Sequence, residues 1–103
     1  MPQNCCDINS SESRKIDLLA RFVKMINEPN RLKILCLLKH GELCVCEIFE
    51  TLNLPQNLIS HHLKELSSLE IVSFRKEGTK VIYSRNELVI DKYSKLLNEV
   101  IQI

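Results

Sequence analysis

The sequence contains only two glycines, no Cys-x-x-Cys motif and no strand–helix–strand alternation. These absences argue against an enzyme of the thiol-oxidoreductase type, and we expect no enzymatic activity. No apolar run approaches the roughly 18 residues that span a bilayer. The first seven residues also lack the basic start and the apolar stretch of a secretory signal. We therefore expect a cytoplasmic protein without a membrane segment.

Neither sign of charge dominates, because 14 Lys and Arg stand against 13 Asp and Glu and the net charge is +1. The distribution is nevertheless uneven. Residues 14–39 hold seven Lys/Arg and two acids, whereas residues 40–53 hold three acids and no Lys/Arg. Residues 54–85 hold five Lys/Arg, three acids and two histidines. Such a pattern can present a modest positive face to DNA phosphates.

Five cysteines in 103 residues are a high count for a chain of one small domain. In the reducing cytoplasm thiols stay reduced, and an odd number cannot pair completely. This cysteine content therefore favours metal binding or redox sensing over structural disulfides.

Hydrophobic periodicity predicts a mostly α-helical fold with a small β-hairpin. Residues 1–12 are polar and predict a flexible arm, followed by one domain over residues 13–103. Predicted helices begin near Ser13, at Pro29, at Cys44 and at Gln56, and a last helix covers residues 88–101. Two strands are expected at residues 72–77 and 80–85. The apolar side of the second helix is assigned to Leu32, Leu35, Cys36 and Leu38, with Cys36 as a buried small hydrophobe.

The fourth predicted helix, residues 56–69, has two distinct faces. One face is apolar apart from a single histidine, which we interpret as a core or interface residue. The opposite face is polar. The apolar face holds Ile59, His62, Leu63, Leu66 and Leu69, and the polar face holds Asn57, Ser60, His61, Lys64 and Ser68.

Four segments resemble the ArsR/SmtB family of bacterial metal-responsive repressors. They are residues 29–35 (PNRLKIL), 41–47 (GELCVCE), 58–64 (LISHHLK) and 75–80 (RKEGTK). The resemblance implies a winged helix-turn-helix in a homodimer held by the first and last helices. Surplus apolar residues on the last helix are compatible with such an interface. These residues are Ile90, Ile101 and Ile103.

In that family the segment at residues 58–64 is the recognition helix. A recognition helix places short polar side chains at its N-terminal end in the major groove. Gln56 and Asn57 suit adenine edges, and Ser60 and His61 suit bases or phosphates. Lys64 lies a turn further along and would meet the backbone.

The predicted hairpin corresponds to the wing of the family. Its basic residues, Arg75, Lys76 and Lys80, are expected at the neighbouring minor groove or its phosphates. A dimer would present two recognition helices to an inverted repeat whose half-sites lie about one helical turn apart. The resemblance therefore implies double-stranded operator DNA as the partner.

The pair Cys44 and Cys46 falls in the segment that resembles the metal-binding box of the family. In a regular helix, residues i and i+2 point to nearly opposite sides, so both thiolates would not reach one ion. Residues 44–47 occupy the register of a capping box with Cys44 as N-cap. Because an N-cap has non-helical backbone angles, Cys44 can turn toward Cys46. The helix N-terminus also favours the thiolate form.

Two thiolates are too few for a tight site. Arsenic-responsive members can carry a third cysteine three residues further on, where this chain has Phe49. Other members draw cysteines from the N-terminal arm, which makes Cys5 and Cys6 the candidates. Three thiolates suit As(III) or Sb(III), and three or four suit Cd(II) or Pb(II). Zinc-sensing members use histidines of the last helix, and residues 88–101 contain none.

The sequence therefore predicts a DNA-binding repressor that a thiophilic ion releases from its operator, with As(III) or Sb(III) preferred. Cd(II) or Pb(II) is the alternative inducer. A second interpretation keeps the fold and makes the thiols a redox switch, through a disulfide between the arm and Cys44 or Cys46. A third is a winged helix used only for protein contacts.

Overall fold

The computed structural model describes residues 10–102. It contains five helices and three strands in that part of the chain, and the predicted class, mostly α with a small hairpin, is confirmed. The first helix begins three residues earlier than predicted, inside the segment assigned to the arm. The elements are α1 (Ser10–Ile26), α2 (Pro29–Leu38), β1 (Leu43–Cys44), α3 (Val45–Leu52), α4 (Gln56–Ser68), β2 (Val72–Glu77), β3 (Lys80–Arg85) and α5 (Glu87–Ile101).

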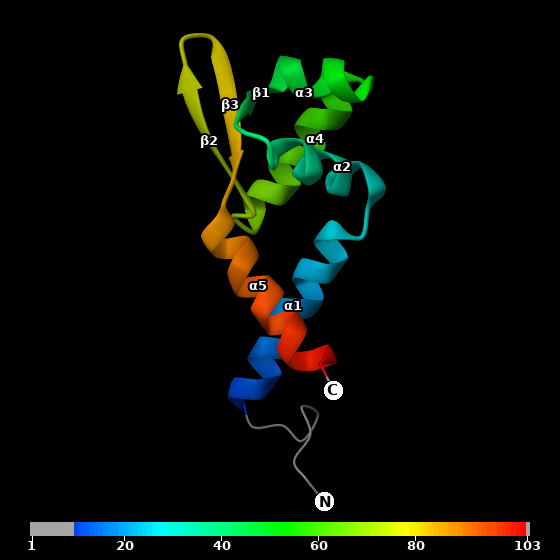
Figure 1. The fold of residues 1–103 in the computed structure, drawn as a ribbon, viewed down its shortest axis with the longest axis vertical. Coiled ribbons are helices and arrows are strands. Elements are labelled where there is room, and N and C mark those ends of the chain that lie inside the picture. The colour runs from blue at the N-terminus through cyan, green and yellow to red at the C-terminus, as the bar shows by residue number, and fades with distance from the viewer. Residues whose placement is uncertain (1–9, 103) are drawn as a thin grey trace, which may run out of the picture.

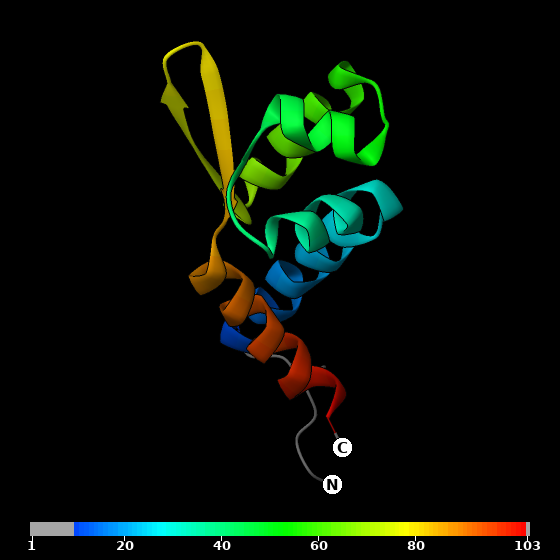
Figure 2. The same cartoon turned by 45° about the horizontal axis from the view of Figure 1, so that its top comes forward.

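The molecule is elongated, and different elements occupy its two ends (Figure 1). Helices α1 and α5 lie side by side at one end, where the rings of Phe22 and Tyr93 stack with centroids 4.4 Å apart. Helices α2, α3 and α4 lie toward the other end, beside the β2–β3 hairpin (Figure 1). The β2–β3 hairpin extends away from the helices in both views (Figures 1 and 2). This is the order and shape of a winged helix.

The core lies between α2, α3, α4 and the base of the sheet, and it continues to α1 and α5 through Leu19, Phe22 and Tyr93. The apolar face predicted for α4 is confirmed, since four of its five residues are buried and Leu69 is half-buried. Burial of each of the aliphatic side chains on this face contributes about 1.5–3 kcal/mol. The fully buried side chains are Ile34, Ile48, Ile59, Leu63, Leu66 and Ile71.

The predicted apolar side of α2 was wrong at two positions. Leu32 is 49% exposed, and Cys36 is an exposed free thiol, whereas Ile34 is fully buried. Most residues of this helix are apolar, so periodicity alone defines no face. Packing against α4 selects Ile34 and Leu38 instead.

The predicted hairpin has the expected strands, residues 72–77 and 80–85. Glu77 pairs with Lys80 across the turn, where Gly78 has φ of 64°, a conformation that glycine adopts without strain. The short strand β1 was not predicted. It adds to the other edge of β3, with Leu43 opposite Tyr83 and Cys44 opposite Ile82. The backbone of Cys44 is thereby fixed to the wing.

The turn between α3 and α4 is short. Asn53 ends α3 with φ of 54° and ψ of 48°, the left-handed conformation that Asn tolerates better than most residues. Pro55 then precedes the first residue of α4 with φ of −58°. The two helices are the helix-turn-helix pair, and α4 is its second member.

Apolar side chains remain exposed on the terminal helices. Leu88 is 84% exposed and Ile101 is 64% exposed on α5, and Val23 on α1 is 41% exposed. Ile90 is half-buried, and Ile103 lies outside the described residues. None of the helices within residues 10–102 combines the length and apolar character that crossing a bilayer requires.

Candidate nucleic-acid interface and thiol site

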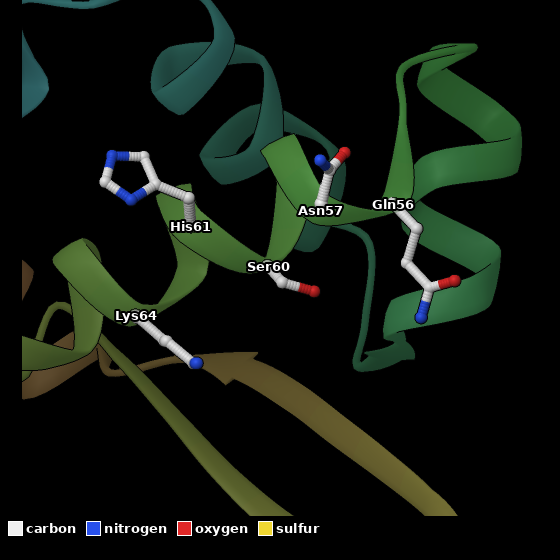
Figure 3. Close-up of a pocket in the computed structure, with 5 residues that line it drawn as sticks. All are labelled: Gln56, Asn57, Ser60, His61 and Lys64. Carbon is white, nitrogen blue, oxygen red and sulfur yellow. The ribbon is translucent and has the colours of Figure 1, made fainter.

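The five polar residues predicted to read DNA on α4 lie together on one surface. Gln56, Asn57, Ser60, His61 and Lys64 line a shallow hollow of about 650 Å³. Figure 3 shows them spaced along α4, with Gln56 in its first turn. Ser60 is half-buried and the other four are exposed. The helix therefore offers amide, hydroxyl, imidazole and ammonium groups on one accessible face.

The basic residues of the wing differ in their surroundings. Arg75 donates to Glu42 at 2.9 Å and to Glu77 at 2.9 Å, so two carboxylates hold its guanidinium. Lys76 and Lys80 are exposed and form no ion pair with any residue between 10 and 102. Glu42 belongs to the segment that leads into β1, which the sequence did not connect with Arg75. The DNA contacts of all three basic residues stay predictions.

The cap predicted at Cys44 is present. Cys44 has φ of −76° and ψ of 160°, an extended conformation, and α3 begins at Val45. The Glu47 carboxylate accepts the backbone N–H of Cys44 at 3.0 Å, which is the carboxylate half of a capping box. The cap thus fixes the orientation of the first thiol relative to the helix.

The predicted convergence of the two thiols is confirmed. The side chains of Cys44 and Cys46 are joined as a disulfide, with Cα atoms 5.4 Å apart. This oxidised pair differs from the expected reduced thiols. It also differs from the alternative disulfide to the arm, because the cap places the two sulfurs against each other. Cys44 is 2% exposed and Cys46 is half-buried.

The cysteine pair opens into a hollow of about 280 Å³ between the helix-turn-helix and the wing. Gln56 and Ser60 of α4 form one wall of this hollow. Residues 79–81 of the wing, including Lys80, form the other wall. The cysteines therefore line the same hollow as three residues of the predicted DNA-binding set, Gln56, Ser60 and Lys80. Thr79 and Val81 were not singled out by the sequence, since only β1 brings them to the cysteines.

The donor set for an ion is incomplete within residues 10–102. No group of three His, Cys, Asp or Glu side chains in this range is placed to hold a metal ion. The two sulfurs fit part of a thiolate site, because they reach the same point in space. Cys5 and Cys6, the predicted further ligands, lie outside the described residues.

A buried histidine connects the recognition helix to α1 and α2. Arg31 donates from Nε to Nδ1 of His62 at 3.1 Å, and also donates to the backbone oxygen of Met25 at 3.2 Å. Nε2 of His62 lies 3.3 Å from the Glu28 carboxylate. His62 is 5% exposed, as expected for a core histidine. Burial lowers the pKa of His62, the Glu28 charge opposes that shift, and the Arg31 charge adds to it.

The sequence did not identify Glu28 and Arg31 as partners of His62. Glu28 is the N-cap of α2 and accepts the N–H of Arg31 at 3.2 Å. Pro29 in the first turn is a recognisable helix start, but a glutamate is not a typical N-cap residue. The separation of 31 residues between Arg31 and His62 gave no local signal for the contact.

Known proteins similar to this chain are transcriptional regulators. The model of the bacterial regulatory protein, arsR family, matches residues 28–73, from the N-cap of α2 into β2. The arsenical resistance operon repressor of Staphylococcus xylosus is 39% identical over 80 residues, which cover 78% of this chain and 77% of the repressor. A homolog of the cadmium resistance transcriptional regulatory protein CadC from Staphylococcus aureus is 37% identical over 70 residues, covering 67% of this chain and 58% of that protein.

A solved structure shows the same architecture. It is the homodimeric winged helix-turn-helix DNA-binding domain of a possible ArsR-family transcriptional regulator from Mycobacterium bovis. The TM-score is 0.74 and the identity is 28%, and the match covers 87% of this chain and 84% of that domain.

Proposed function

Because the chain belongs to the arsR family of bacterial regulatory proteins, we propose that it is a transcriptional repressor released from operator DNA by a thiophilic ion. The family consists of regulators rather than enzymes. Two relatives carry names that specify arsenical and cadmium resistance. The observation that carries the proposal is the hollow in which Cys44 and Cys46 border Gln56 and Ser60 of α4.

In the proposed complex, α4 enters the major groove and its exposed polar face reads base edges. Gln56 and Asn57 can contact adenine in a bidentate manner, and Ser60 and His61 contact bases or phosphates. Lys64 meets the backbone. Lys76 and Lys80 bind phosphates next to the minor groove. Arg75 also binds a phosphate when its ion pairs with Glu42 and Glu77 break.

We place the dimer interface on α1 and α5. The exposed Leu88, Ile101 and Val23 support this assignment, since a small domain buries such surface against a partner. The homodimeric Mycobacterium bovis domain has the same fold. A two-fold dimer would bind an inverted repeat with half-sites about one helical turn apart.

The ion site that we propose consists of Cys44 and Cys46, in their reduced form, with Cys5 or Cys6. Three thiolates suit As(III) or Sb(III), which we take as the inducer, and a fourth would suit Cd(II) or Pb(II). The ion would hold the arm at the start of α3. Since Cys44 is also paired with β3, the chain would transmit that restraint to the wing and to α4. Couplings between two sites are typically about 1–3 kcal/mol and are reciprocal, so operator DNA would weaken ion binding equally.

An anaerobic titration of the reduced protein with As(III) and with Cd(II) tests the ion site. Thiolate-to-metal absorption should grow to one ion per protomer, and X-ray absorption should count three sulfurs around arsenic. If cadmium is bound by four sulfurs and no arsenic complex forms, Cd(II) is the inducer. Absence of both signals would exclude As(III) and Cd(II) as inducers and overturn the proposed ion site.

The Cys44–Cys46 disulfide supports a second candidate, a thiol redox switch in the same hollow. Closing the disulfide releases two protons and passes two electrons to an oxidant such as an organic disulfide. The oxidised protein would then bind operator DNA with altered affinity without any metal. Equal operator affinity of the reduced and oxidised forms would eliminate this candidate.

A further inference from the structure

A third surface hollow lies where the C-terminal part of α4 meets α1. Its volume is about 470 Å³, and its walls include three basic residues, Arg21, Lys24 and Arg31. Glu65 and Ser68 of α4 also line it. This basic hollow is distinct from the hollow at the cysteines and from the hollow that the five DNA-reading residues line.

The basic hollow borders the DNA-reading face of α4. Successive residues of an α-helix are about 100° apart around its axis. Going around α4, Gln56 and Ser60 therefore lie at one edge of the polar face, Lys64 lies near its centre, and Ser68 and Glu65 follow at the other edge. The first edge meets the wing at Thr79 and Lys80, and the second meets α1 at Arg21 and Lys24.

The charges in the basic hollow favour an anion. Arg31 is held in place by His62 and by the backbone of Met25, so it supplies a fixed positive charge. Arg21 and Lys24 are exposed, and neither side chain forms a hydrogen bond or ion pair with a residue of the described range 10–102. Glu65 is the one carboxylate that lines the hollow. Three cations against one carboxylate leave a net positive site with two uncommitted side chains.

We propose that Arg21 and Lys24 bind the DNA backbone on the side of α4 opposite the wing. This inference rests on the proposed DNA-binding function. A helix in the major groove has a phosphate strand on each side, and contacts to both strands fix its orientation. The wing lysines bind one phosphate strand. Arg21 and Lys24 bind the other strand from α1, which also contributes to the assigned dimer interface.

The test is the salt dependence of operator binding by the full-length reduced protein and by Arg21→Gln/Lys24→Gln. Each lost phosphate contact lowers the steepness of log K against log salt by about 0.9, and affinity falls about fivefold per contact at 0.15 M salt. The loss should be the same on operator and on unrelated duplex, because the backbone carries no sequence information. Lys39→Gln, at an exposed lysine that lines none of the three hollows, is the control and should keep the wild-type slope.

Four outcomes separate the possibilities. A reduced slope in the double variant, with the control and the thermal unfolding unchanged, supports the proposal. An unchanged slope overturns it and leaves the proposed function standing. Dissociation of the double variant into monomers would also overturn it, by assigning the surface to a second copy of the chain. If the wild-type protein binds no inverted-repeat DNA, the proposed function itself fails.

Discussion

Nε of Arg31 lies 3.1 Å from Nδ1 of His62 and donates a hydrogen bond to it. The acceptor role leaves Nδ1 unprotonated, so the imidazole is neutral and carries its proton on Nε2, 3.3 Å from the Glu28 carboxylate. The same guanidinium donates to the backbone oxygen of Met25 in α1. One arginine therefore connects α1 to the buried side of the recognition helix.

We predict that the protein loses stability as the pH falls below the ordinary histidine pKa. Burial lowers the pKa of His62, so the folded state binds fewer protons than the unfolded state just below pH 6.5. The free energy of unfolding then decreases by up to about 1.4 kcal/mol for each pH unit, down to the folded-state pKa. Above pH 6.5 His62 is neutral in both states, so it adds no further pH dependence to the free energy of unfolding. Urea unfolding at pH 5 to pH 8 measures it.

Two variants test whether His62 is the group that causes this pH dependence. His62→Gln removes the titrating group, so its unfolding free energy should vary less with pH than that of the wild type. The substitution should also lower the free energy of unfolding at pH 8 by about 1–3 kcal/mol, because Arg31 and Glu28 lose a buried partner. His61→Gln, on the exposed face of the same helix, is the control. A wild-type pH profile in His62→Gln would refute the assignment.

Local pattern was sufficient where neighbouring residues determine the structure. The two faces of α4, the hairpin around Gly78 and the cap at Cys44 were predictable, because periodicity and turn chemistry are local. The buried side of α2 was not, since an apolar helix is oriented by its packing partners, and Cys36 was placed on the wrong side. The bond between Arg31 and His62, and the pairing of Cys44 with Ile82, join residues distant in sequence.

Glu47 should stabilise the start of α3 through its bond to the N–H of Cys44. Glu47→Ala leaves that donor unpaired and should lower the free energy of unfolding by about 1 kcal/mol. Glu47→Gln keeps an acceptor but loses the charge at the helix N-terminus, which is typically worth about 0.3–1 kcal/mol. Urea denaturation should rank wild type above Glu47→Gln, and Glu47→Gln above Glu47→Ala. Equal stability of all three proteins would show that the cap contributes nothing.

The ion pair between Glu42 and Arg75 should compete with DNA for the guanidinium. Glu42→Gln removes one of the two carboxylates on Arg75, so more Arg75 becomes available to phosphates. Operator affinity should rise, and the salt dependence should steepen by up to about 0.9 per half-site. Stability should change by less than about 1 kcal/mol, because the pair is exposed. Fluorescence anisotropy of labelled operator measures the affinity.

Glu50→Gln is the matched control for that experiment. Glu50 is an exposed glutamate of α3 that has no contact with Arg75 in the structure. Its removal changes the net charge by the same amount. If the two variants bind operator equally, the gain comes from net charge alone, and competition for Arg75 is rejected.

The most direct test of ion sensing is release of operator DNA on addition of arsenite to the reduced protein. Fluorescence anisotropy should show release of wild-type protein and of Cys36→Ser, whose thiol lies on the exposed side of α2. Cys44→Ser and Cys46→Ser should bind operator like the wild type and remain bound when arsenite is added. Release of either variant at the arsenite concentration that releases the wild type would contradict the thiol site proposed here.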